Sequence, residues 1–282
     1  MPLPGTITCP QTSGRGELAT RGREQRLVFG EVADLYDRYR PTYPEAVFDR
    51  IVEFGHLRSG DRALEVGAGT GRATRPLALR GLAVTALEPS SAMARLARQN
   101  TGDIAAVRVE ESSFEDWPLP PQPFRPVASV QAWHWVRPEV AYGKAGDALE
   151  PGATLALVWN TATGEENRSG VGAELEAEIE AVYRREAPTL AQGVPREREL
   201  DRRHEIEASG AFVEVVREDY PWSTTYASEE YLGLLRTQSD HRLLNPPVLE
   251  RLLNGIGLVL AGHRGTIDQS YVAKLYLARC PQ

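Results

Sequence analysis

The sequence has few of the residues that cross-link a chain, ligate metals or anchor it in a membrane. It contains two cysteines, Cys9 and Cys280, near opposite ends, so we expect free thiols in a reducing compartment rather than a disulfide framework. No apolar run approaches the roughly 20 residues of a membrane-spanning helix, and the N-terminus lacks the basic-then-apolar pattern of a signal peptide. We therefore expect a cytoplasmic protein that does not enter a membrane.

Positive charge is also in the minority. Lys and Arg total 32 against 39 Asp and Glu, which gives a net charge of −7. This balance argues against a protein that binds nucleic acid or an anionic membrane through charge alone. The five histidines have no metal-ligand spacing, and the chain contains no nucleophile elbow, phosphate-binding P-loop or zinc pattern. We therefore expect neither a nucleic-acid partner nor a metal ion.

The composition is that of an ordinary globular domain with alternating secondary structure. Of 282 residues, 41% are hydrophobic and 25% are charged. Residues 1–26 sustain no period, and we expect a disordered tail there, followed by a single domain over 27–282. Helical patterns alternate with apolar strands, which predicts an α/β fold with a mainly parallel sheet and helices on both faces. The expected strands are 63–66, 83–87, 104–109, 127–131, 154–159, 211–216 and 271–278.

The strongest local signal is the glycine-rich segment 64–71, which reads LEVGAGTG. Its glycines follow a strand and open a helix, so backbone N–H groups can approach a ligand closely. Glu88 ends the next strand, where a carboxylate can accept hydrogen bonds from both hydroxyls of a ribose. Together these features predict a nucleoside-binding site; the alternative is a tight turn beside a solvated glutamate.

The spacing of the glycines bears on which nucleoside is bound. The dinucleotide fingerprint is G-x-G-x-x-G, whereas this chain has G-x-G-x-G, with Glu65 two residues before Gly67. A carboxylate at that point repels a pyrophosphate but accepts a zwitterionic amino-acid moiety. The segment resembles motif I of the class I S-adenosylmethionine-dependent methyltransferases. In that family the acid helps to hold the ammonium group of the methionyl part.

The resemblance covers most of the chain. Segments 29–44, 131–135 and 149–153 are similar to the N-terminal segment, the strand-four signature and the turn before strand five in a bacterial branch of small-molecule methyltransferases. It implies a Rossmann-like sheet of seven strands, parallel except for the last, and a single domain that acts on a small molecule as monomer or homodimer. It also implies helical lid additions, which we place at 27–55, 160–205 and 220–270.

The resemblance also implies a cofactor site for S-adenosylmethionine. The glycines would line its methionine and ribose, Glu88 would hold the ribose hydroxyls, and Pro89 and Met93 would lie on the adenine side. Residues 113–115 follow strand three, where the family frames the adenine ring, although 110–116 allows several registers. The expected cofactor-binding residues are Glu65, Gly67, Ala68, Gly69, Gly71, Glu88, Pro89, Met93, Ser113, Phe114, Glu115 and Gln131.

The expected acceptor site is aromatic. Tryptophans fall near the carboxyl ends of the predicted strands, where ligands bind in open parallel sheets, and an aromatic pocket could also stabilise a sulfonium. His134 directly follows strand four and is our candidate general base. The alternatives are that the rings pack the fold and that His134 positions a loop. The expected substrate-binding residues are Tyr36, Tyr39, Arg40, Trp133, Trp135, Trp159 and Trp222.

Two other functions remain open on the sequence alone. A nicotinamide-dependent oxidoreductase shares the glycine loop and the acid after the second strand, but the glycine spacing and Glu65 argue against it. A protein of the same fold could also retain the cofactor without transferring its methyl group, because the general base is weakly identified. The main expectation is methyl transfer from S-adenosylmethionine to a small molecule by in-line displacement.

Overall fold

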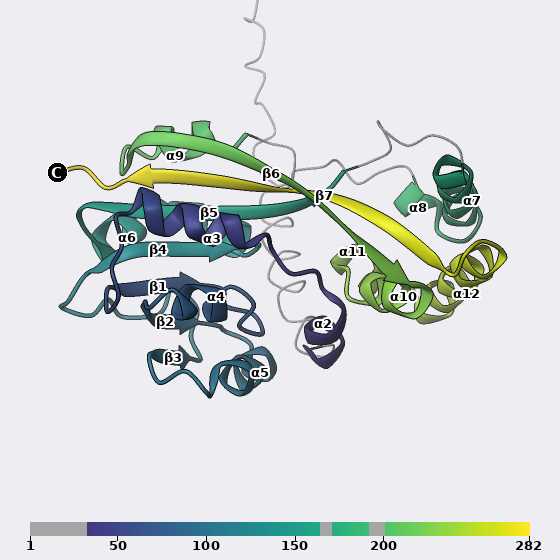
Figure 1. Ribbon diagram of the computed structural model, residues 1–282, viewed down its shortest axis with the longest axis horizontal. Helices are drawn as coiled ribbons and strands as arrows, with labels where there is room; N and C mark the ends of the chain where they lie inside the picture. Colours follow the sequence, from purple (N-terminus) through teal and green to yellow (C-terminus); the bar gives the residue numbers. More distant parts are fainter. Residues whose placement is uncertain (1–32, 164–170, 192–200) are drawn as a thin grey trace, which may run out of the picture.

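The fold is known from a computed structural model that describes residues 33–163, 171–191 and 201–282. Residues 1–32, 164–170 and 192–200, which include the expected tail over 1–26 and Cys9, lie outside the described residues. Within the described part, one seven-stranded sheet has the order β3-β2-β1-β4-β5-β7-β6 (Figure 1). The strands are β1 Arg62–Val66, β2 Ala83–Leu87, β3 Val107–Glu110, β4 Phe124–Val130, β5 Leu149–Ala162, β6 Val213–Ala227 and β7 Thr266–Arg279.

The strand directions confirm the predicted Rossmann-like class. Neighbours from β3 to β5 pair in parallel, whereas β7 is antiparallel to both β5 and β6. The order reverses between β1 and β4, and in open α/β sheets this switch point is where a ligand crevice forms. The helices are α2 Ala33–Tyr39, α3 Glu45–Phe54, α4 Thr74–Leu79, α5 Ser91–Thr101, the 3-10 helix η2 Trp133–Trp135, α6 Pro138–Ala148, α7 Val171–Glu186, α8 Pro188–Ala191, α9 Arg203–Ala208, α10 Ser228–Arg236, α11 Ser239–Arg242 and α12 Pro246–Gly262.

Local sequence signals explain where several helices begin. The Ser90 hydroxyl caps α5 by accepting a hydrogen bond from the Met93 N–H at 3.5 Å, as expected for a serine at this position. Helices α6 and α12 begin with Pro138 and Pro246, whose missing N–H would have had no intrahelical partner. For α5 and α6, these starts place the helix directly after a loop that lines the crevice.

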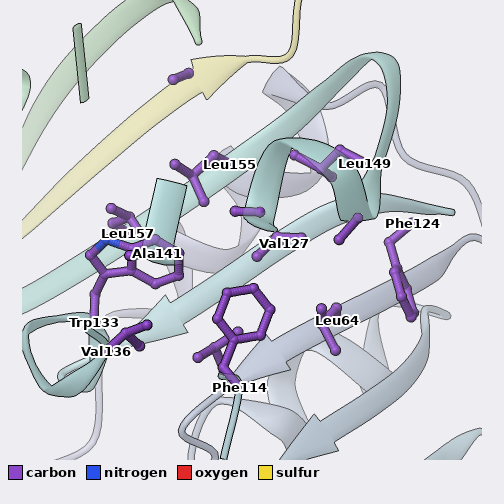
Figure 2. Close-up of a cluster of buried hydrophobic side chains, with 14 of the residues drawn as sticks. Leu64, Phe114, Phe124, Val127, Trp133, Val136, Ala141, Leu149, Leu155 and Leu157 are labelled. Carbon is purple, nitrogen blue, oxygen red and sulfur yellow. The ribbon is translucent and has the colours of Figure 1, made fainter. Parts of the chain in front are cut away.

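Side chains alternate across the sheet and form a core on each face. Leu64 and Val66 of β1 belong to one cluster, which α6 covers, while Ala63 belongs to the cluster beneath α3 and α4. Figure 2 shows the first cluster, with Trp133 drawn beside Ala141. The alternation follows from the two-residue repeat of a strand, and both faces are buried because helices cover both.

The main departure from the sequence expectation is the length of the last two strands. Residues 220–270 were expected to be helical, but β6 continues to Ala227 and β7 begins at Thr266. Strand β5 likewise extends into the expected insertion, as far as Ala162. In β6 from residue 220 onward, half-buried or buried positions alternate with exposed ones. That two-residue period is the pattern of a strand with one wet face.

These long strands carry a separate helical cap. In Figure 1, β6 and β7 run past the ends of the other strands toward α7, α10 and α12. The cap has its own buried cluster, which joins α7, α10 and α12 to the far ends of β6 and β7. Within the expected additions, the described helices are α2 and α3 in 27–55, α7, α8 and the start of α9 in 160–205, and α10 to α12 in 220–270. No helix in the described residues is long and apolar enough to cross a bilayer.

Candidate functional site

A pocket of about 910 Å³, including its open mouth, lies at the carboxyl ends of β1 to β4. Its floor is the loop after β1, and its walls are the loops after β2, β3 and β4. Residues of α2 and of the segment between α2 and α3 close one side. We call it the glycine-loop pocket. Its position is the switch point of the sheet, where ligands bind in open α/β proteins.

The glycines shape the floor of this pocket. Gly67 and Gly69 have φ angles of +76° and +58°, in the left-handed region that other residues seldom adopt. A Cβ on Gly67 would lie 2.2 Å from the Cβ of Ala132, whereas no atom lies within 4 Å of a Cβ placed on Gly69. The loop therefore needs glycine at Gly67 for packing and leaves open space above Gly69.

The Glu88 carboxylate is held firmly beside the glycine loop. One oxygen accepts a hydrogen bond from the Gly69 N–H at 2.8 Å, and the other accepts one from the Ser90 N–H at 2.9 Å. Glu88 is buried but lines the pocket. Thr70, also buried in the lining, has a hydroxyl oxygen without a hydrogen-bond partner in the described structure. The floor thus presents a carboxylate and an orphaned hydroxyl to a ligand.

Glu65 is a second carboxylate beneath the loop. It is only 1% exposed, and it accepts a hydrogen bond from the Thr74 hydroxyl at 2.5 Å. Burial raises the pKa of Glu65 to about 7, although the Thr74 hydrogen bond acts in the opposite direction. A cationic group in the pocket would favour the ionised carboxylate.

A second, smaller pocket of about 520 Å³ adjoins the first. We call it the side pocket. Tyr36, Tyr43, Arg72 and Gln131 line both pockets. The side pocket also reaches the cap, because α10 and the turn after it contribute to its wall. Its remaining lining residues are Arg40, Pro41, Asn160, Ala162, Leu234, Gln238 and Tyr271.

Gln131 stands at the boundary of the two pockets and has an unusual backbone. It follows β4 with a φ of +57°, which is uncommon for a residue with a side chain. Its N–H donates to the carbonyl of Val158 at 2.8 Å, and its Nε2 donates to the carbonyl of Asn160 at 2.8 Å. These two bonds to β5 hold the turn in place. Such strained residues gather at functional sites.

The structure gathers almost all of the predicted cofactor residues. The glycine-loop pocket is lined by Glu65, Gly67, Ala68, Gly69, Glu88, Pro89, Met93, Ser113, Phe114, Glu115 and Gln131. Gly71 does not line it; with a φ of +89°, its backbone lies close enough to α5 that a Cβ would be 3.3 Å from the Cα of Ala97. Gly71 therefore serves helix packing.

The predicted acceptor residues separate into two groups. Tyr36 and Trp135 line the glycine-loop pocket, and Tyr36 and Arg40 line the side pocket. Tyr39 lines neither; its ring packs under α10, where a Cβ on Gly233 would lie 2.4 Å from it. Trp222 also lies outside both linings, but it stacks on Tyr271 at 4.8 Å and thereby backs the side pocket.

Three of the predicted site residues, His134, Trp133 and Trp159, line neither pocket. Trp133 and Trp159 are buried in the core, against Tyr142 and Tyr276 respectively. His134 is exposed, lines neither pocket, and accepts a hydrogen bond on Nδ1 from the Trp159 indole at 3.3 Å. The turn of η2 sends His134 outward while Trp135 faces the pocket. In this arrangement His134 lies outside both linings, and its role as a general base stays a prediction.

Several lining residues were missed by the sequence reasoning. Tyr43 and Arg72 line both pockets, and burial keeps the pKa of the Tyr43 phenol far above its usual value. Arg72 directly follows the glycine motif, so its place beside the site could have been found. Asn160 and Gln238 come from segments without a motif. In the described residues, no group of three or more His, Cys, Asp and Glu is arranged to hold a metal ion.

Comparisons with known proteins agree with this geometry. A family model described as a methyltransferase domain matches residues 64–157, from β1 to β5. An uncharacterized methyltransferase of Mycobacterium tuberculosis is 28% identical over 258 residues, which cover 92% of this chain and 96% of that protein. One of Anoxybacillus flavithermus is 31% identical over 149 residues, covering 48% of this chain and 67% of that protein.

Solved structures share the fold. A protein of Anaeromyxobacter dehalogenans, assigned there as a type II methyltransferase, superposes with a TM-score of 0.60 at 22% identity, covering 86% of this chain and all of that one. Phosphoethanolamine N-methyltransferase 2 of Haemonchus contortus, in complex with phosphomonomethylethanolamine and S-adenosylhomocysteine, gives 0.52 at 16% identity, covering 96% of this chain and 61% of that one.

The sheet order and the glycine-loop pocket define a Rossmann-like protein with a nucleoside-type cofactor site at its switch point. Among such proteins, the matches to the methyltransferase domain and to its bacterial relatives decide between the classes that the sequence left open. The chain belongs to the class I S-adenosylmethionine-dependent methyltransferases, and S-adenosylmethionine is its cofactor. It does not belong to the nicotinamide-dependent oxidoreductases.

Proposed function

We propose that the protein transfers the methyl group of S-adenosylmethionine to a small molecule bound in the side pocket. The observation that carries this proposal is the junction of the two pockets, which share Tyr36, Tyr43, Arg72 and Gln131. An acceptor in the side pocket would meet the cofactor at this junction. The side pocket is lined by residues of the sheet, of the segment around α2 and of the cap.

The residues of the glycine-loop pocket fit the cofactor. The open space above Gly69 leaves room for the cofactor against the backbone, and Glu88 stands where its carboxylate can accept hydrogen bonds from ribose hydroxyls. Glu65 offers buried negative charge to an ammonium group, and the orphaned hydroxyl of Thr70 offers a polar contact. When bound, S-adenosylmethionine supplies an activated methyl group that leaves its sulfur as the acceptor atom bonds to the carbon.

The contribution of the protein to this reaction is alignment. Gln131 and Tyr36 at the junction would orient the acceptor, and the aromatic wall formed by Tyr36, Tyr43 and Trp135 would exclude water. Good alignment alone lowers a barrier by up to about 7–11 kcal/mol. A dedicated general base is then needed only for acceptors that must lose a proton in the transfer step, and His134 does not line either pocket.

The cofactor assignment is tested first by binding. Glu88→Ala should weaken the binding of S-adenosylhomocysteine about 10- to 100-fold in isothermal titration calorimetry, because two hydrogen bonds to a charged group are lost. Glu139→Ala, the same change at an exposed position in the first turn of α6, is the matched control and should bind normally. Unaltered affinity in Glu88→Ala would contradict the ribose assignment.

The methyl transfer itself is tested with a broad panel of small acceptors. We expect S-adenosylhomocysteine to form with at least one acceptor class, with a methylated product of matching mass. If the protein binds S-adenosylhomocysteine but no acceptor in the panel is methylated, the alternative of a cofactor-retaining protein without methyl transfer would be favoured. Failure to bind S-adenosylhomocysteine would reject both.

A further inference from the structure

The side pocket is lined by two guanidinium groups that form no ion pair in the described part of the chain. Its described lining contains Arg40 and Arg72 but neither Asp nor Glu. Arg40 donates to the hydroxyl and the carbonyl of Thr237, at 2.9 and 2.6 Å, and Arg72 donates to the carbonyl of Asp37. These acceptors are neutral, and neither guanidinium is ion-paired within the described part of the chain. A cleft lined by charge of one sign attracts ligands of the other.

A buried amide in the same pocket lacks a hydrogen-bond partner. Asn160 is 8% exposed, and its Oδ1 accepts a hydrogen bond from the Trp222 indole at 2.9 Å. An indole N–H can only donate, so this bond fixes which end of the amide is oxygen. The Nδ2 group at the other end is buried and has no partner in the described structure. Leaving a buried donor unsatisfied is costly, so Nδ2 is suited to a ligand acceptor.

The environment of Asn160 is rigid on two sides. The Gln131 amide donates to its backbone carbonyl at 2.8 Å, and Trp222 is stacked on Tyr271 with an interplanar angle of 20°. Asn160 lies near the end of β5, which is paired with β7 at this position. The donor is therefore fixed in direction before any ligand arrives, as specific recognition requires.

The two pockets carry opposite charge. Glu65, Glu88 and Glu115 line the glycine-loop pocket, while the lining residues that belong only to the side pocket include Arg40 and no acid. A sulfonium cofactor suits the first pocket. An acceptor of negative charge suits the second, because its charge would be attracted to both the pocket and the bound cofactor.

We propose that the acceptor is a small carboxylate, and that the side pocket binds this carboxylate through Asn160 Nδ2 and the Arg40 guanidinium. The inference rests on the proposed methyl transfer and adds the chemical class of its substrate. A planar carboxylate accepts several hydrogen bonds at once from amide and guanidinium donors. Gln238, on the cap side of the same pocket, provides a further amide within the lining. Arg72 lines both pockets, so its guanidinium could contact either the acceptor or the cofactor.

The decisive variant is Asn160→Asp. It keeps the oxygen that accepts from Trp222 and replaces only the donor with a second carboxylate oxygen, which would repel an acid. Asn254→Asp makes the same change at an exposed position of α12 and is the matched control. Gln238→Glu introduces the same charge from the cap side and covers the case in which Asn160→Asp does not fold.

The measurement is calorimetric binding to protein saturated with S-adenosylhomocysteine. The probes are acid and amide pairs of increasing size: acetate with acetamide, succinate with succinamide, and benzoate with benzamide. We expect the acid of at least one pair to bind the unmodified protein and Asn254→Asp at least tenfold more tightly than its amide. Asn160→Asp and Gln238→Glu should lose that preference.

The outcomes separate this inference from the proposed function. Equal binding of acid and amide, no binding of any acid, or an acid preference that survives in Asn160→Asp and Gln238→Glu would overturn the carboxylate proposal and leave methyl transfer intact. If Asn160→Asp instead loses affinity for S-adenosylhomocysteine, Asn160 binds the carboxylate of the cofactor itself. That result would also overturn the proposal. Failure of the unmodified protein to bind S-adenosylhomocysteine would reject the proposed function itself.

Discussion

At the scale of single residues, Glu65 is held in the folded chain at an energetic cost. Its side chain is buried under the glycine loop, and burial raises its pKa from 4.5 to about 7. Between these two pH values the folded chain binds more protons at this group than the unfolded chain does. Stability contributed by Glu65 therefore falls as the pH rises from about 4.5 to 7 and stays reduced above it. A residue that weakens the fold while facing a ligand pocket is typical of a binding group.

Glu65→Gln should remove this destabilisation, which can be measured as a pH-dependent change in the free energy of unfolding. At pH 8 the ligand-free variant should be more stable than the unmodified protein by on the order of 3 kcal/mol, since one pKa unit corresponds to about 1.4 kcal/mol. Near pH 4.5 the two should be nearly equal. Urea denaturation at both pH values measures the difference, and a stability change independent of pH would contradict the assignment. The variant should also bind S-adenosylmethionine more weakly at pH 8, because the negative charge is gone.

Residues of the cofactor site were predictable because the signal is local. The glycines and Glu88 each adjoin a strand, so their place at the carboxyl edge follows from the order of the elements. The tryptophans were harder, because strand-end rings can face either way. Trp133 faces the core and Trp135 faces the pocket, a difference set by the short turn of η2, whereas Trp159 lies on β5 and faces the core. Asn160 was not predictable, since its role depends on the distant Trp222.

At the scale of elements, the contact between α2 and α10 determines how the cap meets the site. Gly233 of α10 lies against the ring of Tyr39, and Arg40 just after α2 bonds to Thr237 just after α10. The space for the ring exists only because residue 233 has no side chain. Tyr36, on the same short helix as Tyr39, lines both pockets. A shift of α2 would therefore disturb both binding sites together.

Gly233→Ala should displace α2. Alanine gains about 1 kcal/mol of helix propensity, but its Cβ would lie 2.4 Å from the ring of Tyr39, and overpacking costs about 1–3 kcal/mol. We expect a lower unfolding midpoint and roughly tenfold weaker binding of S-adenosylhomocysteine. Gly257→Ala in α12 is the matched control, because its Cβ would meet Leu232 at an ordinary 3.4 Å. Unchanged binding in Gly233→Ala would show that α2 is not coupled to the site.

Element boundaries, like site residues, are predictable from the sequence only where the signal is local. The helix α3 over Glu45–Phe54 has a clear local signal, because Pro44 precedes it and its buried residues Val47, Phe48 and Ile51 recur at helical spacing. The outer halves of β6 and β7 were expected to lie in a helical insertion, although the alternation of more and less exposed positions in β6 is typical of a strand with one solvent-facing side. They form strands because they pair with each other, from the pair of Trp222 with Tyr271 to the pair of Ala227 with Thr266.

At the scale of the whole molecule, the chain has separate cores for the sheet and for the cap. The two sheet clusters share no residue with the cap cluster. The glycine-loop pocket is lined by the strand ends of the sheet, by α2 and by the segment between α2 and α3, whereas the side pocket is also lined by the cap. Cofactor binding and acceptor binding should therefore stabilise different parts of the molecule.

Hydrogen exchange followed by mass spectrometry can detect this division. S-adenosylhomocysteine at 100 times its Kd should add about 2.7 kcal/mol of stability. Protection should rise most at 65–70 and 88–93 and least in α12, whose residues line neither pocket. Equal protection across the cap would mean that the two cores unfold as one cooperative unit.

The long strand β6 has a consequence for association between molecules. It forms the outer edge of the sheet, and an uncovered edge of this length invites another chain to add a strand. Pro221, exposed near its middle, has no N–H to offer such a partner. Nearby, Arg217 is paired with Asp219, and both charges would have to be buried by an added strand. The ribbon that carries the cap is thereby protected from edge-to-edge aggregation.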